Sequence, residues 1–442
     1  MAKVTDVTSP HTTGLNHIDA LLDSGPAWNY MTPAGNSLVY TFSVASGNED
    51  GRTDVAAFSS TQQANTRSML AYISSVTGIS FSETTNGNAA TLHFAMNDIT
   101  DPGTAGLCSW SSSYNFDGQD NLTSYTASAY VYLDSAEWGA QNRALAAGNE
   151  GYETLLHEMG HALGLKHPFE GNSTLPTDTN NTSNTLMSYT SSGGPYSSFN
   201  PYDVAALNWL YGGDGLAGAR GVNSTADGRY LMGSEAADNL TTGAGNDILI
   251  GLAGSDVLDG GAGFDKAVYA SARSNFSLSN NGSSFTLVDR TGILGTDILA
   301  NIERITFSDK VIAFDTSGDA GKLYRLYQAA FDRVPDSGGL GYWINVMEKG
   351  YTLQQIASGF AVSAEFQTLY GTNPTPEAIM AKFYNNVLHR EADPGGIEYW
   401  ANVMRNGGAV AGILEAFSEC PENQASLSGT IRNGTEYTPF FG

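Results

Sequence analysis

Residues 157–167 read HEMGHALGLKH and contain three of the seven histidines in the chain. On a helix, His157 and His161 lie on one face with their imidazoles about 6 Å apart, because side chains four residues apart are neighbours there. Glu158 follows the first histidine directly and lies about 100° further round the helix, where it can reach a water beside an ion without being a ligand. The spacing therefore predicts a helix that offers a two-point chelate and a general base.

The residues after this helix complete the set of ligands. Gly164 can end the helix in the left-handed conformation, and the turn brings His167 back towards the other two histidines. Three histidines with a fourth position open are the arrangement of a catalytic zinc site, because a structural site fills all four positions. Ordinary helix histidines are the alternative, but this extended pattern rarely occurs by chance. We therefore expect one Zn²⁺ held by His157, His161 and His167, with Glu158 as the base.

The pattern H-E-x-x-H-x-x-G-x-x-H resembles that of the metzincin zinc endopeptidases, in which a methionine-containing turn follows. Residues 185–189, TLMSY, are the candidate turn. Pro168 directly after the third histidine, and residues 203–207 (DVAAL) ahead of 210–212 (LYG), are similar to the serralysin branch of these enzymes.

This resemblance implies roles for two residues of the turn. Met187 would form a hydrophobic floor under the zinc site, as a packing residue and not as a ligand. Tyr189 would approach the metal as a displaceable ligand and then donate a hydrogen bond to the oxyanion that forms when water attacks a peptide carbonyl. From the sequence alone, Tyr189 is equally an aromatic residue of the core.

The composition limits the partners and the compartment. The 442 residues include 20 Lys and Arg against 45 Asp and Glu, a formal net charge of -25, which argues against nucleic acid or an anionic membrane as a partner. No cleaved secretory signal and no apolar run of about 18 residues is visible, so no membrane span is predicted. The resemblance implies export through a channel that reads an uncleaved C-terminal signal, and the apolar residues 437–442 (YTPFFG) are consistent with one. Cys108 and Cys420 are either two free thiols or a disulfide.

Periodic stretches outline a catalytic domain over residues 16–215. The resemblance implies a five-stranded sheet with the motif helix behind it, and an edge strand at about 105–112 that pairs with an extended substrate. His93 lies in a strand pattern and is interpreted as a structural or surface residue. Residues 1–15 are expected to be a flexible leader or, by the resemblance, a propeptide. Strand patterns occur at residues 38–43, 79–83, 91–95, 107–110 and 130–133, and helix patterns at 17–22, 61–76 and 151–163.

A nine-residue repeat starts at Gly233, and residues 242–268 read TGAGNDILI, GLAGSDVLD and GGAGFDKAV. These repeats fit the template G-G-x-G-x-D-x-U-x, in which a glycine-rich turn precedes a short strand and the turns stack into a parallel β-roll. Aspartates nine residues apart form two columns, where carboxylates and glycine carbonyls make all-oxygen sites for several Ca²⁺ ions. The predicted calcium ligands are Asp238, Asp247, Asp256, Asp265, Gly243, Gly245, Gly251, Gly254, Gly260, Gly261 and Gly263.

A flexible linker rich in glycine and aspartate is the alternative for these repeats. A linker would lack the apolar residues that occupy the inward positions of the short strands. Strand patterns at 276–278, 285–288 and 302–314 predict a β-sandwich extension of the roll. The predicted inward residues are Ile248, Leu249, Ile250, Val257, Leu258 and Val268.

A second repeat, with an offset of 57 residues, relates residues 327–347 to residues 384–404. Each copy predicts a helix, a D-x-G-G turn and another helix. Asp336 and Asp393 in these turns either bind calcium or cap the following helices. The duplicated unit resembles a helical domain of bacterial secreted and surface-layer-associated proteins, which typical serralysins do not carry.

The expected fold is multidomain. A leader (1–15) precedes an α+β metzincin catalytic domain (16–215), a parallel β-roll calcium-binding domain with a β-sandwich extension (216–317) and an all-α domain (318–442). The expected function is that of a monomeric zinc endopeptidase, stabilised by calcium, which acts on proteins or peptides outside the bacterial cell or at its surface. The alternatives are a surface-layer-associated or adhesion protein with a vestigial protease site, and a protease dedicated to one surface partner.

Overall fold

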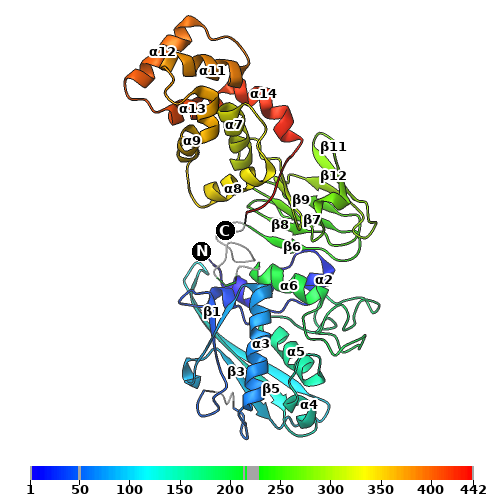
Figure 1. Ribbon diagram of the computed structural model, residues 1–442. Coiled ribbons are helices and arrows are strands. Elements are labelled where there is room, and N and C mark those ends of the chain that lie inside the picture. Colours follow the sequence, from blue (N-terminus) through cyan, green and yellow to red (C-terminus); the bar gives the residue numbers. More distant parts are fainter. Residues whose placement is uncertain (1, 48–50, 213–214, 217–227, 441–442) are drawn as a thin grey trace. The chain divides into compact units, whose positions relative to one another are not determined.

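The computed structural model describes residues 2–47, 51–212, 215–216 and 228–440 (Figure 1). Two compact units divide the chain, residues 1–263 and 264–442, and each is described by itself. The boundaries predicted after residues 215 and 317 stay predictions. Among the described residues, no helix combines the length and the apolar character that a membrane span requires.

A five-stranded sheet with the order β2-β1-β3-β5-β4 forms the core of the first unit. Neighbouring strands are parallel except for β4, which runs antiparallel to β5. All of β3 is buried, as expected for a central strand covered on both faces. Because β4 lies at one edge, the prediction of an edge strand at 105–112 is confirmed. The strands are β1 (Ser37–Thr41), β2 (Ser80–Glu83), β3 (Leu92–Asn97), β4 (Gly106–Phe116) and β5 (Leu122–Asp134).

Helices α3 (Ser60–Thr77) and α5 (Glu150–Ala162) cross one face of this sheet (Figure 1). A capping box starts α3, in which the Ser59 hydroxyl accepts from the Gln62 N–H and the Gln62 amide oxygen accepts from the Ser59 N–H. Gly78, with φ +74°, ends the helix in the left-handed conformation. The remaining elements of this region are α1 (Thr5–Thr8), α2 (Asn16–Asp19), 3₁₀ helices at Trp28–Tyr30 and Gly87–Ala89, α4 (Gly139–Arg143) and α6 (Pro201–Tyr211).

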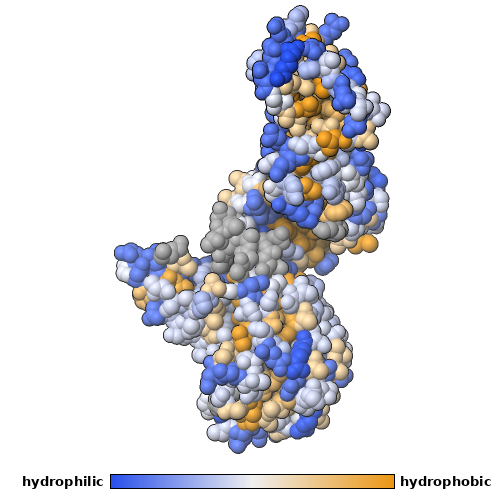
Figure 2. Space-filling view, turned by 60° about the vertical axis from the view of Figure 1, so that its left-hand side comes forward, coloured by the Kyte–Doolittle hydropathy of each residue, from blue (hydrophilic) through white to orange (hydrophobic). Residues whose placement is uncertain are grey.

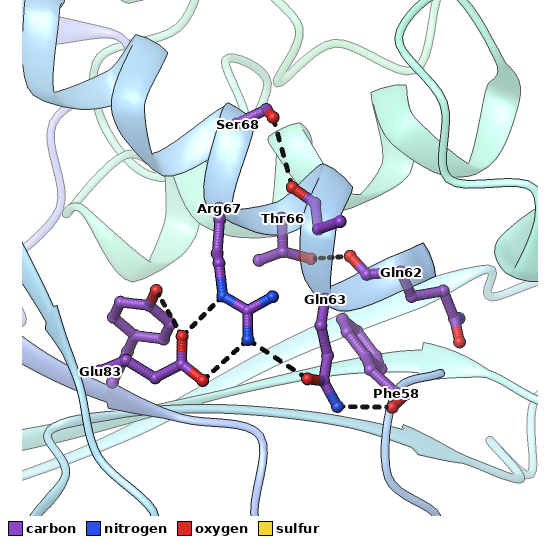
Figure 3. A network of polar contacts seen from close by, with 9 residues as sticks. Phe58, Gln62, Gln63, Thr66, Arg67, Ser68 and Glu83 are labelled. Atoms are coloured by element: carbon purple, nitrogen blue, oxygen red, sulfur yellow. Dashed lines mark hydrogen bonds and ion pairs between the residues drawn. The ribbon is translucent and has the colours of Figure 1, made fainter. Parts of the chain in front are cut away.

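An ion pair joins α3 to the sheet (Figure 3). The Arg67 guanidinium donates from Nε and Nη2 to the two Glu83 carboxylate oxygens at 2.7 and 2.8 Å. The Tyr40 hydroxyl donates to the same carboxylate at 3.1 Å. Both side chains are partly exposed to solvent, so the pair contributes little to the free energy of folding. Its main effect is to position α3 on the strands.

The described part of the predicted leader, residues 2–15, contacts the rest of the first unit, which a flexible leader would not do. The Val4 N–H donates to the Asp120 carbonyl at 3.0 Å, beside the β4–β5 turn. The Trp209 indole N–H donates to the His11 carbonyl at 2.8 Å. Backbone groups of this segment thus form tertiary hydrogen bonds.

Short parallel strands follow the nine-residue repeats. Strand β6 (Tyr230–Met232) pairs with β8 (Ile248–Ile250), and β7 (Asn239–Thr241) pairs with β9 (Val257–Asp259). Alternate repeats therefore share a sheet. One leucine is almost fully buried in β6 and in each of the three repeats from 233 to 259, and Ala267 is buried in the repeat at 260–268. Val257, predicted to point inward, is 37% exposed. The buried leucines are Leu231, Leu240, Leu249 and Leu258.

The second unit begins with strands that the sequence predicts only in part. The predicted strand at 302–314 is divided into β14 and β15, and β13 is an additional strand. Strand β16 lies in the region predicted to be all-α and pairs antiparallel with β15, and Tyr437 in this strand is buried. These strands are β10 (Lys266–Val268), β11 (Phe276–Asn280), β12 (Ser284–Asp289), β13 (Thr296–Ala300), β14 (Arg304–Thr306), β15 (Val311–Ala313) and β16 (Thr435–Tyr437), with a 3₁₀ helix at Arg273–Asn275.

Helices α7 to α14 form the rest of this unit around a shared apolar core. The Asp336 and Asp393 carboxylates accept from the Gly339 and Gly396 N–H groups, each at 2.7 Å. Both aspartates therefore act as N-caps, which is the second of the two interpretations left open by the sequence. The helices are α7 (Asp319–Phe331), α8 (Ser337–Glu348), α9 (Leu353–Ala361), α10 (Ala364–Tyr370), α11 (Pro376–Leu388), α12 (Pro394–Arg405), α13 (Val410–Ser418) and α14 (Pro421–Arg432).

The surface agrees with the acidic composition. On the face in Figure 2, hydrophilic residues cover much of the molecule and apolar residues form small patches. Neither Cys108 nor Cys420 forms a disulfide bond, so they are two thiols. His93 is buried, stacks on Tyr130 with ring centroids 4.6 Å apart, and is a structural residue as predicted.

Substitution Leu249→Ala is expected to lower the free energy of unfolding by about 2–5 kcal/mol, because it removes a fully buried side chain of a repeat. The matched control is Val257→Ala in the next repeat, where partial exposure limits the loss to about 1 kcal/mol. Chemical unfolding at a fixed calcium concentration measures both. Equal losses of unfolding free energy in the two variants would contradict a repeat interior that depends on the buried leucine.

Candidate metal centre

The three predicted ligands converge at the end of α5. One ring nitrogen from each of His157, His161 and His167 lies within 4.8 Å of the others. The Nε2 atoms of His161 and His167 are 3.1 Å apart. Gly164 adopts φ +97°, and this left-handed turn returns the chain so that the third histidine faces the helix.

The Nδ1 atom of each histidine has its own acceptor. His157 Nδ1 lies 2.7 Å from the Leu186 carbonyl, and His161 Nδ1 lies 2.8 Å from the Leu165 carbonyl. Because a carbonyl only accepts, these Nδ1 atoms carry the proton and each Nε2 keeps its lone pair. This tautomer is the one that a metal needs.

His167 has a charged acceptor instead of a carbonyl. Its Nδ1 lies 2.9 Å from a carboxylate oxygen of Glu170. The Phe169 ring stacks on the other side, with centroids 5.1 Å apart and an interplanar angle of 4°. Sequence reasoning missed Glu170, although an acid three residues after a ligand is a signal that could have found it.

Burial keeps the imidazoles of His157 and His161 neutral. Burial, with His161 nearby, lowers the pKa of His157 to about 3. Burial, with His167 nearby, lowers the pKa of His161 to about 4. Neutral imidazoles with inward lone pairs suit Zn²⁺, so the residues fit the ion that the motif predicts.

Met187 lies under the helix as predicted and is fully buried. A Cβ on Gly160 would lie 2.5 Å from the Met187 sulfur, so only glycine allows this approach. The turn is held by the buried Asp203, whose carboxylate accepts from the Thr185 hydroxyl at 2.5 Å and from the Leu186 N–H at 2.8 Å. Burial raises the pKa of Asp203 to about 6. The sequence motif included Asp203 but did not indicate this role.

Glu158 is buried between α5 and the edge strand. Burial raises the pKa of Glu158 to about 8. A hydrogen bond from the Cys108 backbone has the smaller, opposite effect, because it favours the charged form. A Cβ on Gly106 would lie 2.8 Å from the Glu158 Cγ and Oε1 atoms, so glycine lets β4 pass close to the carboxylate. No sequence pattern pointed to Gly106.

Tyr189 lies beside the histidines at the surface of the site. Its ring centroid is 4.6 Å from that of His167, and the residue is 70% exposed. Because the Tyr189 phenol is exposed and lies next to the ligands, Tyr189 is not an aromatic residue of the core, which was the alternative left open by the sequence. Tyr189, His157 and Glu158 line one open cavity of about 470 Å³.

The turns of the repeats also fit their predicted cation. Positive φ values occur at Gly243, Gly245, Gly254, Gly261 and Gly263. A Cβ on Gly263 would lie 1.5 Å from the Gly245 carbonyl, and a Cβ on Gly261 would lie 2.0 Å from the Gly243 carbonyl. Only glycines allow these turns to stack with carbonyl oxygens close together, which hard cations require.

The predicted aspartates lie at these turns. Asp256 and Asp238 come together, since the Asp238 N–H donates to an Asp256 carboxylate oxygen at 2.9 Å. Asp247 is fully buried, and a Cβ on Gly251 would lie 2.3 Å from an Asp256 oxygen. The Gly260 carbonyl accepts from the Thr242 hydroxyl at 2.9 Å. Asp265 is buried in the second unit, where its N–H donates to Glu303.

Substitution Glu170→Ala is expected to weaken zinc binding about 10–100-fold, because the carboxylate orients His167 and raises its basicity. Glu170→Gln, which keeps an acceptor oxygen, should lose less. The matched control is Asp178→Ala, which removes an exposed carboxylate from the same loop region. Competition with a chromogenic chelator measures the affinity without any assay of activity. Unchanged affinity in Glu170→Ala would contradict an orienting role.

Comparisons with known proteins agree with these sites. Residues 41–188 match the family model for matrixin, which implies zinc, and residues 232–267 match that for the RTX calcium-binding nonapeptide repeat, which implies calcium. Residues 319–369 and 357–427 match a domain of unknown function, DUF4214.

Named relatives are similar over part of the chain. Metalloprotease AprA from Pseudomonas entomophila is 27% identical over 259 residues, 51% of each chain. Serralysin G from Dickeya chrysanthemi is 29% identical over 215 residues, 44% of this chain and 43% of that protein. The chain spans about half the length of the curated relatives it matches.

The solved structure of extracellular lipase LipA from Serratia marcescens is 23% identical over 19% of this chain and 15% of that chain, and its TM-score of 0.11 is too low to bear on the fold. The family matches and the named relatives carry the assignment. They support a chain that combines a matrixin-type metzincin domain with RTX calcium-binding repeats, as its resemblance to the serralysin branch predicted.

Proposed function

We propose that the chain is a secreted, calcium-stabilised zinc endopeptidase that hydrolyses peptide bonds of proteins. The observation that carries this proposal is the convergence of three imidazoles beside the buried Glu158, in a cavity bordered by an edge strand. His157, His161 and His167 would hold the ion. Bound there, Zn²⁺ would supply Lewis acidity for activating water and polarising the peptide carbonyl.

The side chains around the ligands supply the proton transfers. Glu158 is not among the three ligands, and its carboxylate takes the proton of the attacking water and passes it to the leaving amine. The Tyr189 phenol donates a hydrogen bond to the oxyanion that develops on the peptide carbonyl. Met187 keeps the floor of the site dry.

The edge strand provides the binding surface for the substrate backbone. Strand β4 contains no charged residue and no proline, the features that usually block pairing at a sheet edge. An extended substrate would add to β4 through main-chain hydrogen bonds, which need little side-chain specificity. This arrangement supports action on unfolded or extended segments of many proteins.

The repeats are proposed to form a parallel β-roll that binds several Ca²⁺ ions through Asp238, Asp247, Asp256 and Asp265 with neighbouring glycine carbonyls. The proposed domains are the catalytic domain at 16–215, the roll with its β-sandwich extension at 216–317 and a largely helical domain at 318–442. We also propose an extracellular or surface-attached monomer.

A vestigial protease site is not favoured, because every predicted catalytic residue is present and the three ligands converge. A surface-layer partner and a single dedicated substrate stay predictions that follow from the C-terminal region alone.

Substitution Glu158→Ala is expected to keep one zinc per chain but to lower kcat/KM for casein about 10²–10⁴-fold, because it removes the general base. The control is Glu150→Gln on the same helix and outside the cavity. Metal analysis with a casein assay, with and without a chelator, measures both. Cleavage by Glu158→Ala at the wild-type rate would show that the mechanism is wrong.

Substitution Asp256→Asn is expected to raise the calcium concentration needed for stabilisation about tenfold or more, because it removes a buried anionic ligand and keeps an acceptor for the Asp238 N–H. Thermal unfolding over a calcium series measures the shift, with Asp178→Asn as an exposed control. A series identical to that of the wild type would exclude Asp256 from the calcium sites.

A further inference from the structure

The cavity beside the metal ligands continues past them towards the start of β4. Its far wall is the loop 101–105, which precedes β4, and its near wall is the first half of α5. Glu153 lies one helical turn before His157, so the two side chains share the face of α5 that borders the cavity. The space of about 470 Å³ accepts a long side chain.

The lining of this cavity is polar and acidic. Hydroxyl groups come from Thr104, Thr154, Thr182 and Ser188, and carboxylates other than that of Glu158 come from Asp101 and Glu153. The lining residues include no lysine and no arginine. A cleft lined by one sign of charge concentrates its field on the bound ligand.

Both carboxylates accept hydrogen bonds from neighbouring groups. The Asp101 carboxylate accepts from the Thr104 hydroxyl at 2.8 Å and from the Gly103 N–H at 3.2 Å, and these bonds lower its pKa. The Glu153 carboxylate accepts from the Tyr196 N–H. Within the described part of the chain, no ion pair involves either residue.

The position of the cavity assigns it to one side of the scissile bond. Strand β4 starts at Gly106 beside Glu158 and runs away from the cavity to Phe116. A substrate paired antiparallel to β4, as β5 is, runs from the Phe116 end to the Gly106 end. The residue that follows the scissile bond therefore faces the loop 101–105.

We propose that this cavity is a specificity pocket for a lysine or arginine on the carboxyl side of the scissile bond, with Asp101 and Glu153 as the recognition groups. The inference rests on the proposed function and adds the class of substrate to it. Two anchored carboxylates offer charge-assisted hydrogen bonds to an ammonium or guanidinium group. A glutamate at that position would meet like charge and be rejected.

The test uses the full-length protein and peptides with one cleavable bond that differ only in the residue after it: lysine, arginine, glutamine, glutamate or leucine. We expect kcat/KM for lysine and arginine to exceed that for glutamine about tenfold, and that for glutamate by more. The preference should shrink as ionic strength rises, because salt screens exposed charges. Mass spectrometry of the products assigns the selective position.

The double variant Asp101→Asn, Glu153→Gln removes both charges and keeps acceptor oxygens for the Thr104, Gly103 and Tyr196 donors. Its ratio of kcat/KM for lysine over glutamine should fall to about 1–2. The control Glu150→Gln, which lies on α5 but outside the cavity, should keep the wild-type ratio.

A preference for leucine, equal cleavage of the lysine and glutamate peptides, selectivity on the amino side of the bond, or an unchanged ratio in the double variant would each overturn the inference and leave the proposed function standing. Failure to cleave casein and every peptide would instead overturn the proposed function and this inference with it.

Discussion

The candidate metal site depends on a buried carboxylate that touches none of the ligands. Asp203 accepts from the Thr185 hydroxyl and the Leu186 N–H, and it also accepts from the Asn200 N–H at 3.0 Å. These bonds fix the turn whose Leu186 carbonyl sets the tautomer of His157. Without these three donors, burying the charge of Asp203 in the interior would cost much free energy. The turn and the start of α6 must therefore form together.

Close approach of backbones is the second constraint. Gly160 lets the Met187 sulfur reach the motif helix, and Gly106 lets β4 pass the Glu158 carboxylate. At both positions a Cβ would lie under 3.0 Å from its neighbour, which side chains do not tolerate without a shift. The metal site and the repeat turns are therefore built by the same means, since the repeats also stack glycine against carbonyl. Glycines at these positions allow close contacts between neighbouring segments and do not indicate flexible backbone.

The sequence predicted what local spacing encodes and missed what long-range contacts decide. Offsets of four and six residues suffice to bring His161 to His157 and His167 to His161, because a helix and a turn have fixed geometry. Strand β13 was missed because Asp297 interrupts its apolar pattern, yet Asp297 is buried and accepts from the Tyr269 hydroxyl at 2.7 Å. Val257 was predicted to point inward because it is an apolar strand residue, whereas β7, β8 and β9 each bury the leucine in the middle of the strand.

The first repeat strand and the metal site share a supporting helix. His17 Nε2 lies 3.2 Å from the Met232 carbonyl at the end of β6, and the His17 ring lies 5.2 Å from that of Tyr202 in α6. Tyr202 directly precedes Asp203, which holds the turn under His157. Contacts thus run without a gap from the calcium-type repeats to the ligands within the first unit. The strand that leads into the repeats therefore packs, through His17, against the helix start that fixes the site.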